Sequence, residues 1–236
     1  RERMKIVVDE NMPHACELFA EFGEVVPLPG RQIGAADLQD ADVLLVRSVT
    51  RVDAGLLASC PRLAFVGTAT IGTDHIDTAL LAERGIPFFS APGCNKYSVG
   101  DYVLSALLVL AERHELSLDQ MSLAVIGAGN TGECVAGKAE ALGMRVLRCD
   151  PPRARTEGGA GFVDYQTALG ADIVSFHVPL TRSGDDVTFH LLDAEQIAAR
   201  PAGQCLINVS RGEVWDNQAL LARQQSDQPL RLVMDV

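Results

Sequence analysis

Three glycines and one aspartate are spaced as a dinucleotide-binding site requires. The segment SLAVIGAGNTG begins at Ser122 and places Gly127, Gly129 and Gly132 in the pattern G-x-G-x-x-G, with Asp150 eighteen residues further on. The first glycine allows a tight strand-to-helix turn, the second lets the main chain approach a diphosphate, and the third allows close helix packing. Amides at the start of the next helix would face that anion. The pattern predicts a dinucleotide site, with a plain glycine-rich turn as the alternative.

The residues around Asp150 favour NAD over NADP as the cofactor. A second expected strand, Arg145–Cys149, ends just before Asp150, where a carboxylate can accept hydrogen bonds from ribose hydroxyls and repel a 2′-phosphate. Arg153 and Arg155 follow in a loop-like segment, residues 151–161, and could instead recognise that phosphate. We favour a solvent-exposed arginine pair, because the carboxylate comes first in the position that the fold provides.

Arg211 is the best candidate for a catalytic electrophile. The segment INVSRGEV places this arginine just past an apolar run, where open α/β sheets bind their ligands. A guanidinium can hold a carboxylate or ketone bidentately and stabilise charge that develops on oxygen. The alternative is a surface ion pair with Glu213 or Asp216.

Two loops nearer the N-terminus also follow expected strands and are rich in small donors. They read VRSVT at residues 46–50 and GTATIGTD at residues 67–74. Hydroxyls and amides there suit carboxylate or phosphate oxygens, and an arginine adds positive charge. We expect at least one of Arg47, Ser48 and Thr70 to contact a ligand. The alternative is turn chemistry, with Asp74 capping a helix over residues 76–84, a role compatible with ligand contact.

No histidine stands out as the proton acceptor that a zinc-independent alcohol dehydrogenase needs. His177 is expected to shape the cofactor pocket and His75 to lie at a helix start, while the others are His14, His114 and His190. The six cysteines lie far apart, with no C-x-x-C pair and no histidine at metal-ligand spacing. We expect reduced thiols in a cytoplasmic protein and no metal site.

The charge balance excludes two classes of partner. A formal net charge of −11 and an isoelectric point near 4.8 disfavour nucleic acid and anionic membranes, since both require a basic surface. The longest apolar stretch, Val99–Ala111, is interrupted by polar residues and is shorter than the roughly 18 to 20 residues of a membrane span. The expected ligands are small molecules held by local cations.

Apolar strand-like runs alternate with helical patterns along the whole chain, which predicts parallel sheets with helical crossovers. The expected strands are Ile6–Val8, Val43–Val46, Ala64–Val66, Leu123–Ile126, Val146–Leu147, Ile173–Phe176, Leu206–Val209 and Leu232–Met234. A long helix over residues 97–112 places a boundary near residue 98. We therefore predict an α/β protein with a small flavodoxin-like substrate domain, residues 1–98, and a Rossmann-type doubly wound parallel sheet, residues 99–236.

These motifs resemble the D-2-hydroxyacid dehydrogenase family over essentially the whole chain. The general features are the glycine pattern with Asp150, FHVPLT at residues 176–181 and LINVSRGEV at residues 206–214. Narrower features are VDENMP at 8–13, VRSVT at 46–50, GTATIGTDHID at 67–77, APGCN at 91–95 and CDPPRA at 149–154. The narrower set implies oxidation of the C2 hydroxyl of 4-phospho-D-erythronate by NAD, yielding 2-oxo-3-hydroxy-4-phosphobutanoate.

The resemblance also implies roles for individual residues. Arg211 would orient and polarise the C2 oxygen, and Ser48 and Thr70 would bind substrate. Asn130 and Thr131 would lie under the diphosphate. The nicotinamide side would be lined by Val178, Val209, Ser210 and Asp235.

In the family, the catalytic glutamate, the general-base histidine and a homodimerising region come after the strand that ends here with Asp235 and Val236. We therefore expect the C-terminal part to be missing, and the 236 residues alone to bind NAD weakly or not at all and to show negligible turnover. Within enzymes, the alternative is a phosphoglycerate dehydrogenase or another D-2-hydroxyacid dehydrogenase. Outside enzymes, it is an NAD-sensing binding protein of the same fold.

Overall fold

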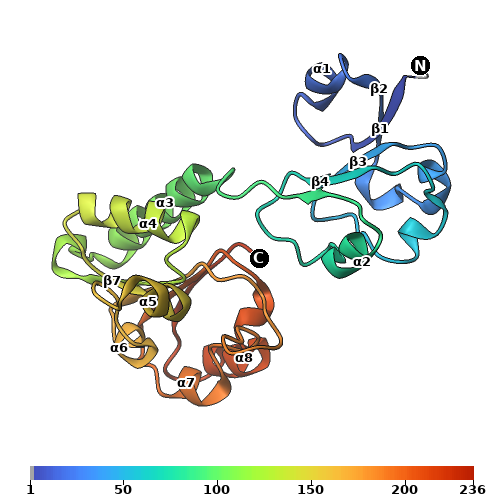
Figure 1. Ribbon diagram of the computed structural model, residues 1–236. Helices are drawn as coiled ribbons and strands as arrows, with labels where there is room; N and C mark the ends of the chain where they lie inside the picture. Colours follow the sequence, from blue (N-terminus) through green and yellow to red (C-terminus); the bar gives the residue numbers. More distant parts are fainter. Residues whose placement is uncertain (1–2) are drawn as a thin grey trace. The chain divides into compact units, whose positions relative to one another are not determined.

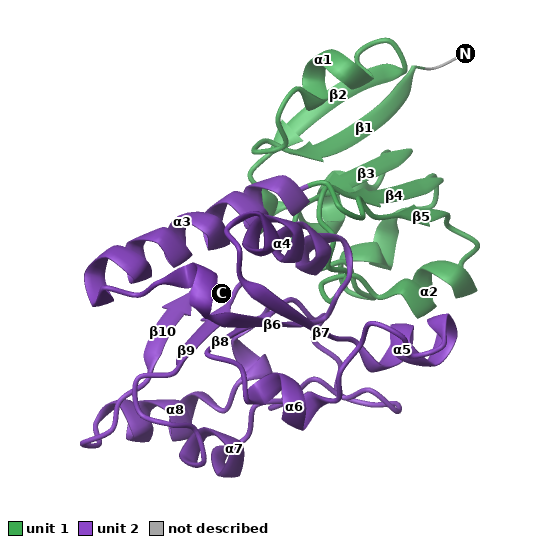
Figure 2. Cartoon of the chain, turned by 90° about the vertical axis from the view of Figure 1, so that its left-hand side faces the viewer, with its two compact units in different colours: residues 1–94 green, residues 95–236 purple. Residues whose placement is uncertain are grey.

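The computed structural model describes residues 3–236 and divides into two compact units, residues 1–94 and 95–236 (Figures 1 and 2). Each unit contains one five-stranded parallel sheet. The long helix α3, Lys96–His114, opens the second unit, so residue 98 falls inside its first turns.

The first unit, unit 1, has strand order β2-β1-β3-β4-β5, the order of flavodoxin-like sheets. Its strands are β1 Met4–Asp9, β2 Gly23–Leu28, β3 Val43–Val46, β4 Phe65–Thr68 and β5 Phe88–Phe89, and its α-helices are α1 Ala15–Phe19 and α2 Thr78–Glu83. The sequence prediction missed β2 and β5. Strand β2 lies at the sheet edge, contains Pro27 and is only half-buried, while β5 has two residues, so neither produces a long apolar run.

The second unit, unit 2, has strand order β10-β9-β8-β6-β7. Its strands are β6 Ser122–Ile126, β7 Arg145–Cys149, β8 Ile173–Phe176, β9 Cys205–Asn208 and β10 Arg231–Met234. Its helices are α3, α4 Asn130–Ala141, α5 Pro151–Glu157, α6 Tyr165–Leu169, α7 Ala194–Ala198 and α8 Asn217–Gln224. A single bridge from Phe162 to Arg148 stands where dinucleotide-binding folds have a third strand, which completes the order 3-2-1-4-5-6. The predicted α/β fold class with a Rossmann-type sheet is confirmed.

Both faces of the unit 2 sheet are covered, because alternate residues of a strand point to opposite sides. Leu123 and Val125 of β6 join a core with α3 and α4, whereas Ala124 and Ile126 join a core with α6, α8 and Trp215 (Figure 2). The central strands β6, β8 and β9 are buried throughout, which explains why they read as continuous apolar runs.

Two local predictions were wrong, and in both an aspartate explains the difference. Asp77, not Asp74, caps α2, since its Oδ1 accepts a hydrogen bond from the Leu80 amide at 2.9 Å. Most of the predicted loop at residues 151–161 is helix α5, which Asp150 caps and which starts with proline at its first position. A proline there is favourable because the first-turn amide has no acceptor inside the helix.

Candidate functional site

The loops that carry the predicted site residues lie at the carboxyl edges of the two sheets. In unit 2 all pairings are parallel, so the segments after β6, β7, β8, β9 and β10 emerge at one edge. The chain direction across the sheet reverses between β6 and β8, which is where open α/β sheets bind ligands.

The glycine turn, residues 127–132, has two glycines that its own packing requires and one that it does not. Gly127 has φ +88°, and a Cβ on Gly132 would lie 2.0 Å from the carbonyl oxygen of Gly127. Gly129 is exposed, and a Cβ there would have no heavy atom within 4 Å. The protein leaves this space open, as the approach of a diphosphate to the main chain requires.

The start of α4 is suited to an anion. Helices α5, α6, α7 and α8 of the same unit each begin with an aspartate whose carboxylate caps them. Gly129 occupies the corresponding position before α4, and no side chain of the described residues caps this helix. Asn130 and Thr131, predicted to lie under the diphosphate, occupy its first two positions, where the amides point out of the helix.

Asp150 joins this turn to the next one. Its Oδ2 accepts a hydrogen bond from the Ala128 amide at 2.9 Å, and its Oδ1 accepts one from the Arg153 amide at 3.0 Å. The carboxylate therefore lies against the glycine turn and does not point away from it. A carboxylate has about four acceptor positions, so capacity remains for ribose hydroxyls.

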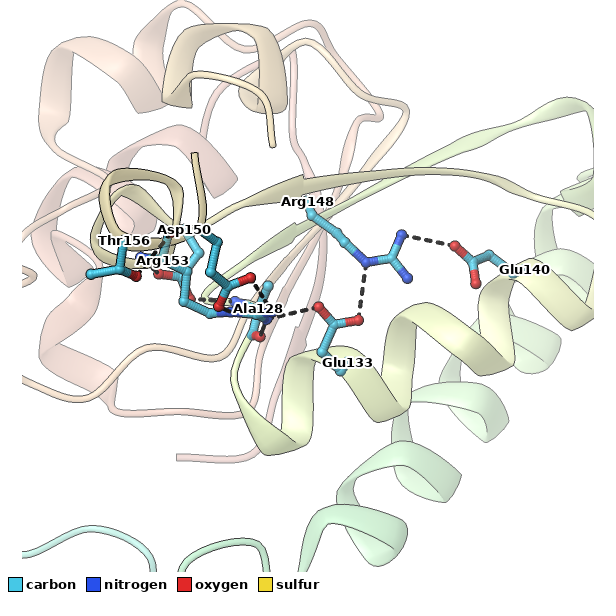
Figure 3. A network of polar contacts seen from close by, with 8 residues as sticks. Ala128, Glu133, Glu140, Arg148, Asp150, Arg153 and Thr156 are labelled. Atoms are coloured by element: carbon cyan, nitrogen blue, oxygen red, sulfur yellow. Dashed lines mark hydrogen bonds and ion pairs between the residues drawn. The ribbon is translucent and has the colours of Figure 1, made fainter. Parts of the chain in front are cut away.

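Arg153 and Arg155 already have carboxylate partners. Arg153 forms ion pairs with Glu133 at 2.9 Å and Glu157 at 2.8 Å, and it also donates to the Ala128 carbonyl (Figure 3). Its pKa is raised further above the usual arginine value, chiefly by the hydrogen bond to Glu157 and next by that to Glu133. Arg155 pairs with Asp186. These pairings favour NAD, because neither guanidinium is held ready for a 2′-phosphate.

Figure 3 shows how the same network continues along α4. Arg148 of β7 donates to Glu133 at 3.0 Å and to Glu140 at 2.8 Å, which raises its pKa, with the Glu140 bond as the larger cause. Glu133 thereby bridges Arg148 and Arg153. These ion pairs fix helix α4, which carries Asn130, relative to strand β7, which ends just before Asp150.

His177 lies directly behind the glycine turn. Its carbonyl oxygen would be 2.7 Å from a Cβ on Gly127, and its Nε2 is 2.8 Å from the Ser175 hydroxyl. Burial lowers its pKa to about 3, and Nδ1 is buried without a hydrogen-bond partner. The ring is therefore neutral near pH 7 and does not accept a proton there, while the His177 main chain packs against the glycine turn.

Arg211 is positioned by Asn208, a residue that sequence reasoning passed over. The buried Asn208 side chain ends β9, donates from Nδ2 to the Arg211 carbonyl at 2.9 Å and accepts the Ser210 amide at 3.0 Å. Glu213 and Asp216, the two residues weighed as surface partners of Arg211, also have other roles: Glu213 pairs with Arg182, and Asp216 caps α8. The sequence did contain a signal for Asn208, because it is a polar residue at the end of an otherwise apolar strand.

The other predicted cofactor residues also follow strands of this sheet. Val178 comes after β8 and would lie 2.8 Å from a Cβ on Gly127. Val209 and Ser210 follow β9, and Asp235 follows β10, with its amide donating to the Asn208 carbonyl at 2.9 Å. Their sequence positions thus lie along the same edge as the glycine turn.

A pocket of about 540 Å³ adjoins Gly129 and Asn130 and includes residues that the sequence did not single out. Lys96, Tyr97, Glu133 and Cys134 line it together with Arg153. Lys96 and Tyr97 come from the first turn of α3, which packs against α4. Only the packing of the two helices reveals this neighbourhood, because the residues are distant in sequence.

In unit 1 the predicted substrate residues follow two adjacent strands. Arg47 and Ser48 come after β3, and Thr70 comes two residues after β4. Arg47 and Thr70 are half-buried, whereas Ser48 is exposed. Thr50, from the same loop, is buried and donates to the Gly30 carbonyl at 2.8 Å, so its hydroxyl has a structural role.

Two further observations concern residues 3–236 only. No helix among them is both long and apolar enough to cross a bilayer. No group of three or more histidine, cysteine, aspartate or glutamate side chains in that range is arranged to hold a metal ion.

Comparison with known proteins gives these features a context. Residues 109–236 match the model of a family described as D-isomer specific 2-hydroxyacid dehydrogenase, NAD binding domain. Among curated relatives, an erythronate-4-phosphate dehydrogenase of Aeromonas hydrophila is 86% identical over 99% of this chain and 63% of its own length. One of Tolumonas auensis is 63% identical over 99% of this chain and 62% of its own length. The chain thus spans about 63% of the relative from Aeromonas hydrophila.

Solved structures share the fold. A D-lactate dehydrogenase from Aquifex aeolicus, complexed with NAD and lactic acid, has a TM-score of 0.82 at 25% identity and covers 98% of this chain and 77% of its own. An NAD+-bound 3-phosphoglycerate dehydrogenase from Entamoeba histolytica has a TM-score of 0.84 at 23% identity, covering 99% and 80%. The second likeness concerns the fold alone.

Proposed function

Because the chain belongs to the D-isomer specific 2-hydroxyacid dehydrogenases, carrying their NAD-binding domain, we propose that the protein oxidises 4-phospho-D-erythronate with NAD. The product is 2-oxo-3-hydroxy-4-phosphobutanoate, and the step belongs to pyridoxal 5′-phosphate biosynthesis. The observation that carries the substrate assignment is the 86% identity to an erythronate-4-phosphate dehydrogenase over 99% of this chain. The glycine turn supports the cofactor, since Gly129 leaves open space beside an uncapped helix.

In the proposed reaction, each unit contributes its own set of binding residues. The amides of Asn130 and Thr131 face the diphosphate, Asp150 accepts from the ribose hydroxyls, and Val178, Val209, Ser210 and Asp235 line the nicotinamide side. When bound, NAD supplies the acceptor for the hydride that leaves C2. Arg211 holds the C2 oxygen and stabilises negative charge on it as the carbonyl forms. Arg47, Ser48 and Thr70 form the substrate side in unit 1.

The hydroxyl proton needs an acceptor other than His177, whose pKa of about 3 leaves it a very weak base near pH 7. The relatives are longer than this chain, and we place the general-base histidine, its glutamate partner and the homodimer contacts in that additional length. Cytoplasm is the proposed location, in keeping with six cysteines that are all free thiols.

The test is NADH formation by a protein of full family length that contains this chain. Turnover of 4-phospho-D-erythronate with NAD, at a kcat/KM well above that for 3-phosphoglycerate, is the expected result. Faster turnover of 3-phosphoglycerate would reassign the substrate. NAD binding without turnover of any 2-hydroxy acid would instead favour a sensing protein.

A further inference from the structure

We propose that Thr70 recognises a hydrogen-bond donor on the substrate, the hydroxyl on C3, and that Thr68 and His75 hold Thr70 in that role. This inference rests on the proposed function, because it assigns one group of the proposed substrate. It also reverses the polarity assumed from the sequence, in which loop hydroxyls donate to carboxylate or phosphate oxygens. The geometry of three hydrogen bonds in unit 1 determines the new polarity.

The direction of each hydrogen bond follows from the one before it. Oγ1 of Thr70 donates its only proton to the Gly72 carbonyl at 2.8 Å. At the 2.7 Å contact between the two threonines, Thr68 must therefore be the donor. Having used its proton, the Thr68 oxygen accepts from Nε2 of His75 at 3.0 Å, so Nε2 carries a proton.

In this chain of hydrogen bonds, the Thr70 hydroxyl can act toward a ligand only as a hydrogen-bond acceptor. A hydroxyl oxygen has two acceptor positions, and the Thr68 proton occupies one of them. The remaining position belongs to a half-buried side chain at the carboxyl edge of the sheet. Thr70 can accept one more hydrogen bond, but it cannot donate to an anion without breaking its bond to Gly72.

The surrounding main chain keeps the chain of bonds in place. The Thr70 carbonyl accepts the Ala91 amide at 3.0 Å, and the His75 carbonyl accepts the Val52 amide at 2.8 Å. Thr68 and the His75 side chain are both buried, with 5% and 9% of their surface exposed. Reversing the bonds would remove the hydrogen bond from Thr70 to the Gly72 carbonyl, so only two of the three hydrogen bonds would remain.

The proposed substrate has one hydroxyl that suits such an acceptor. The proton of the C2 hydroxyl must pass to the general base during oxidation, so that hydroxyl has another partner. The C3 hydroxyl keeps its proton throughout the reaction. In 3-phosphoglycerate the C3 oxygen is a phosphate ester and carries no proton, so an acceptor at this position selects 4-phosphoerythronate over that alternative.

The decisive experiment compares two substrates in a protein of full family length that contains this chain. One is 4-phospho-D-erythronate, and the other is its 3-deoxy analogue, 2-hydroxy-4-phosphobutanoate. Thr70→Val keeps the shape of the side chain and removes the oxygen. We expect it to lower kcat/KM roughly 2- to 12-fold for phosphoerythronate, the range of one neutral hydrogen bond, and to leave the 3-deoxy analogue unchanged. Thr70→Ser retains the oxygen and should recover most of the kcat/KM for phosphoerythronate that Thr70→Val loses.

A second pair of variants tests the positioning role of His75. His75→Leu removes the donor to Thr68 and should raise KM for phosphoerythronate while leaving KM for the 3-deoxy analogue unchanged. His75→Gln keeps an N–H donor and should restore the lower KM. A general packing defect would affect both substrates.

Two outcomes would overturn the inference in different ways. An equal loss with both substrates in Thr70→Val would mean that Thr70 contacts the shared carboxylate or phosphate. That result would leave the proposed function intact. Absence of turnover of either compound by the unsubstituted enzyme would instead refute the proposed function, and the inference with it.

Discussion

The carboxyl edges of the two sheets contrast in the groups that they present. Beside α4 in unit 2, the proposed anion site consists of main chain: Gly129, where a Cβ would have no heavy atom within 4 Å, and a helix start that no side chain of the described residues caps. After β4 in unit 1, the proposed site consists of side chains, in which His75, Thr68 and Thr70 are joined in one chain of hydrogen bonds. The comparison teaches that a main-chain site binds any ligand with a diphosphate, whereas a side-chain site selects by the polarity of single atoms.

The largest expected effect concerns Arg211, because it tests whether unit 2 contributes a catalytic side chain in addition to its main-chain amides. Arg211→Gln should lower kcat by roughly 10²- to 10³-fold, because one preorganised donor to a developing oxyanion is lost. The measurement is steady-state NADH formation by a protein of full family length. Arg182→Gln is the control, since it removes an exposed ion pair with Glu213 at 2.6 Å. Equal activity in both variants would remove Arg211 from the catalytic role.

Asp150 is the side chain that tunes the main-chain site. Asp150→Ala should reduce the preference for NAD over NADP by roughly 1 to 3 kcal/mol, the scale of a lost hydrogen bond to a charged group. Binding constants for both cofactors give the answer. Asp164→Ala is the matched control, because Asp164 caps α6 as Asp150 caps α5. Both should lose about 1 kcal/mol of stability. Unchanged selectivity in Asp150→Ala would exclude a ribose contact.

The two glycines of the turn separate folding from binding. Gly132→Ala should lower the free energy of unfolding by roughly 1 to 3 kcal/mol, because its Cβ would meet the Gly127 carbonyl at 2.0 Å. Gly129→Ala should change that free energy by less than about 1 kcal/mol, yet weaken NAD binding. Urea unfolding followed by the fluorescence of Trp215, buried in the same unit, measures the first quantity. Comparable destabilisation by both substitutions would contradict the distinction.

The smallest expected effect concerns pH. The pKa of His177 is lowered by burial to about 3, and in the unfolded chain it returns to about 6.5. The unfolded state therefore binds more protons between these values, so stability is fully present above about pH 6.5 and falls as the pH decreases. From about pH 7 to about pH 5.5 the loss attributable to this ring is about 1 kcal/mol.

The His177 contribution is isolated by comparison with His177→Gln, which has no titrating ring. Its stability should lose that part of the decline, and the difference between the two pH profiles is the measurement. Parallel profiles would mean that the ring has the same pKa in the folded and unfolded states.

The sequence predicted most of the fold of unit 2 and the position of its glycine turn, because both leave regular patterns. Buried parallel strands such as β6 and β8 read as unbroken apolar runs, and the glycine turn requires glycine at fixed spacing. The half-buried edge strand β2 and helix α5 were missed. The first lacks such a run, and the second begins with two prolines that also occur in loops.

The side-chain relationships could not be predicted, since they join common residues whose contacts depend on packing. Asn208 reads as one polar residue after a strand, yet it holds both Ser210 and Arg211. No sequence pattern predicts that Thr68, Thr70 and His75 are joined in one chain of hydrogen bonds. Likewise, the pairing of Arg153 with Glu133 depends on the packing of two neighbouring turns.

Asp150 has one further consequence. A single carboxylate fastens the amide of Ala128 in one turn and begins α5 in the next, so the two turns are mechanically coupled. A compound that fills only the adenosine side of the proposed cofactor site would therefore also stiffen the glycine turn, to which the diphosphate is proposed to bind. Inhibitor fragments that are extended from the adenosine side would therefore meet a glycine turn that is already ordered.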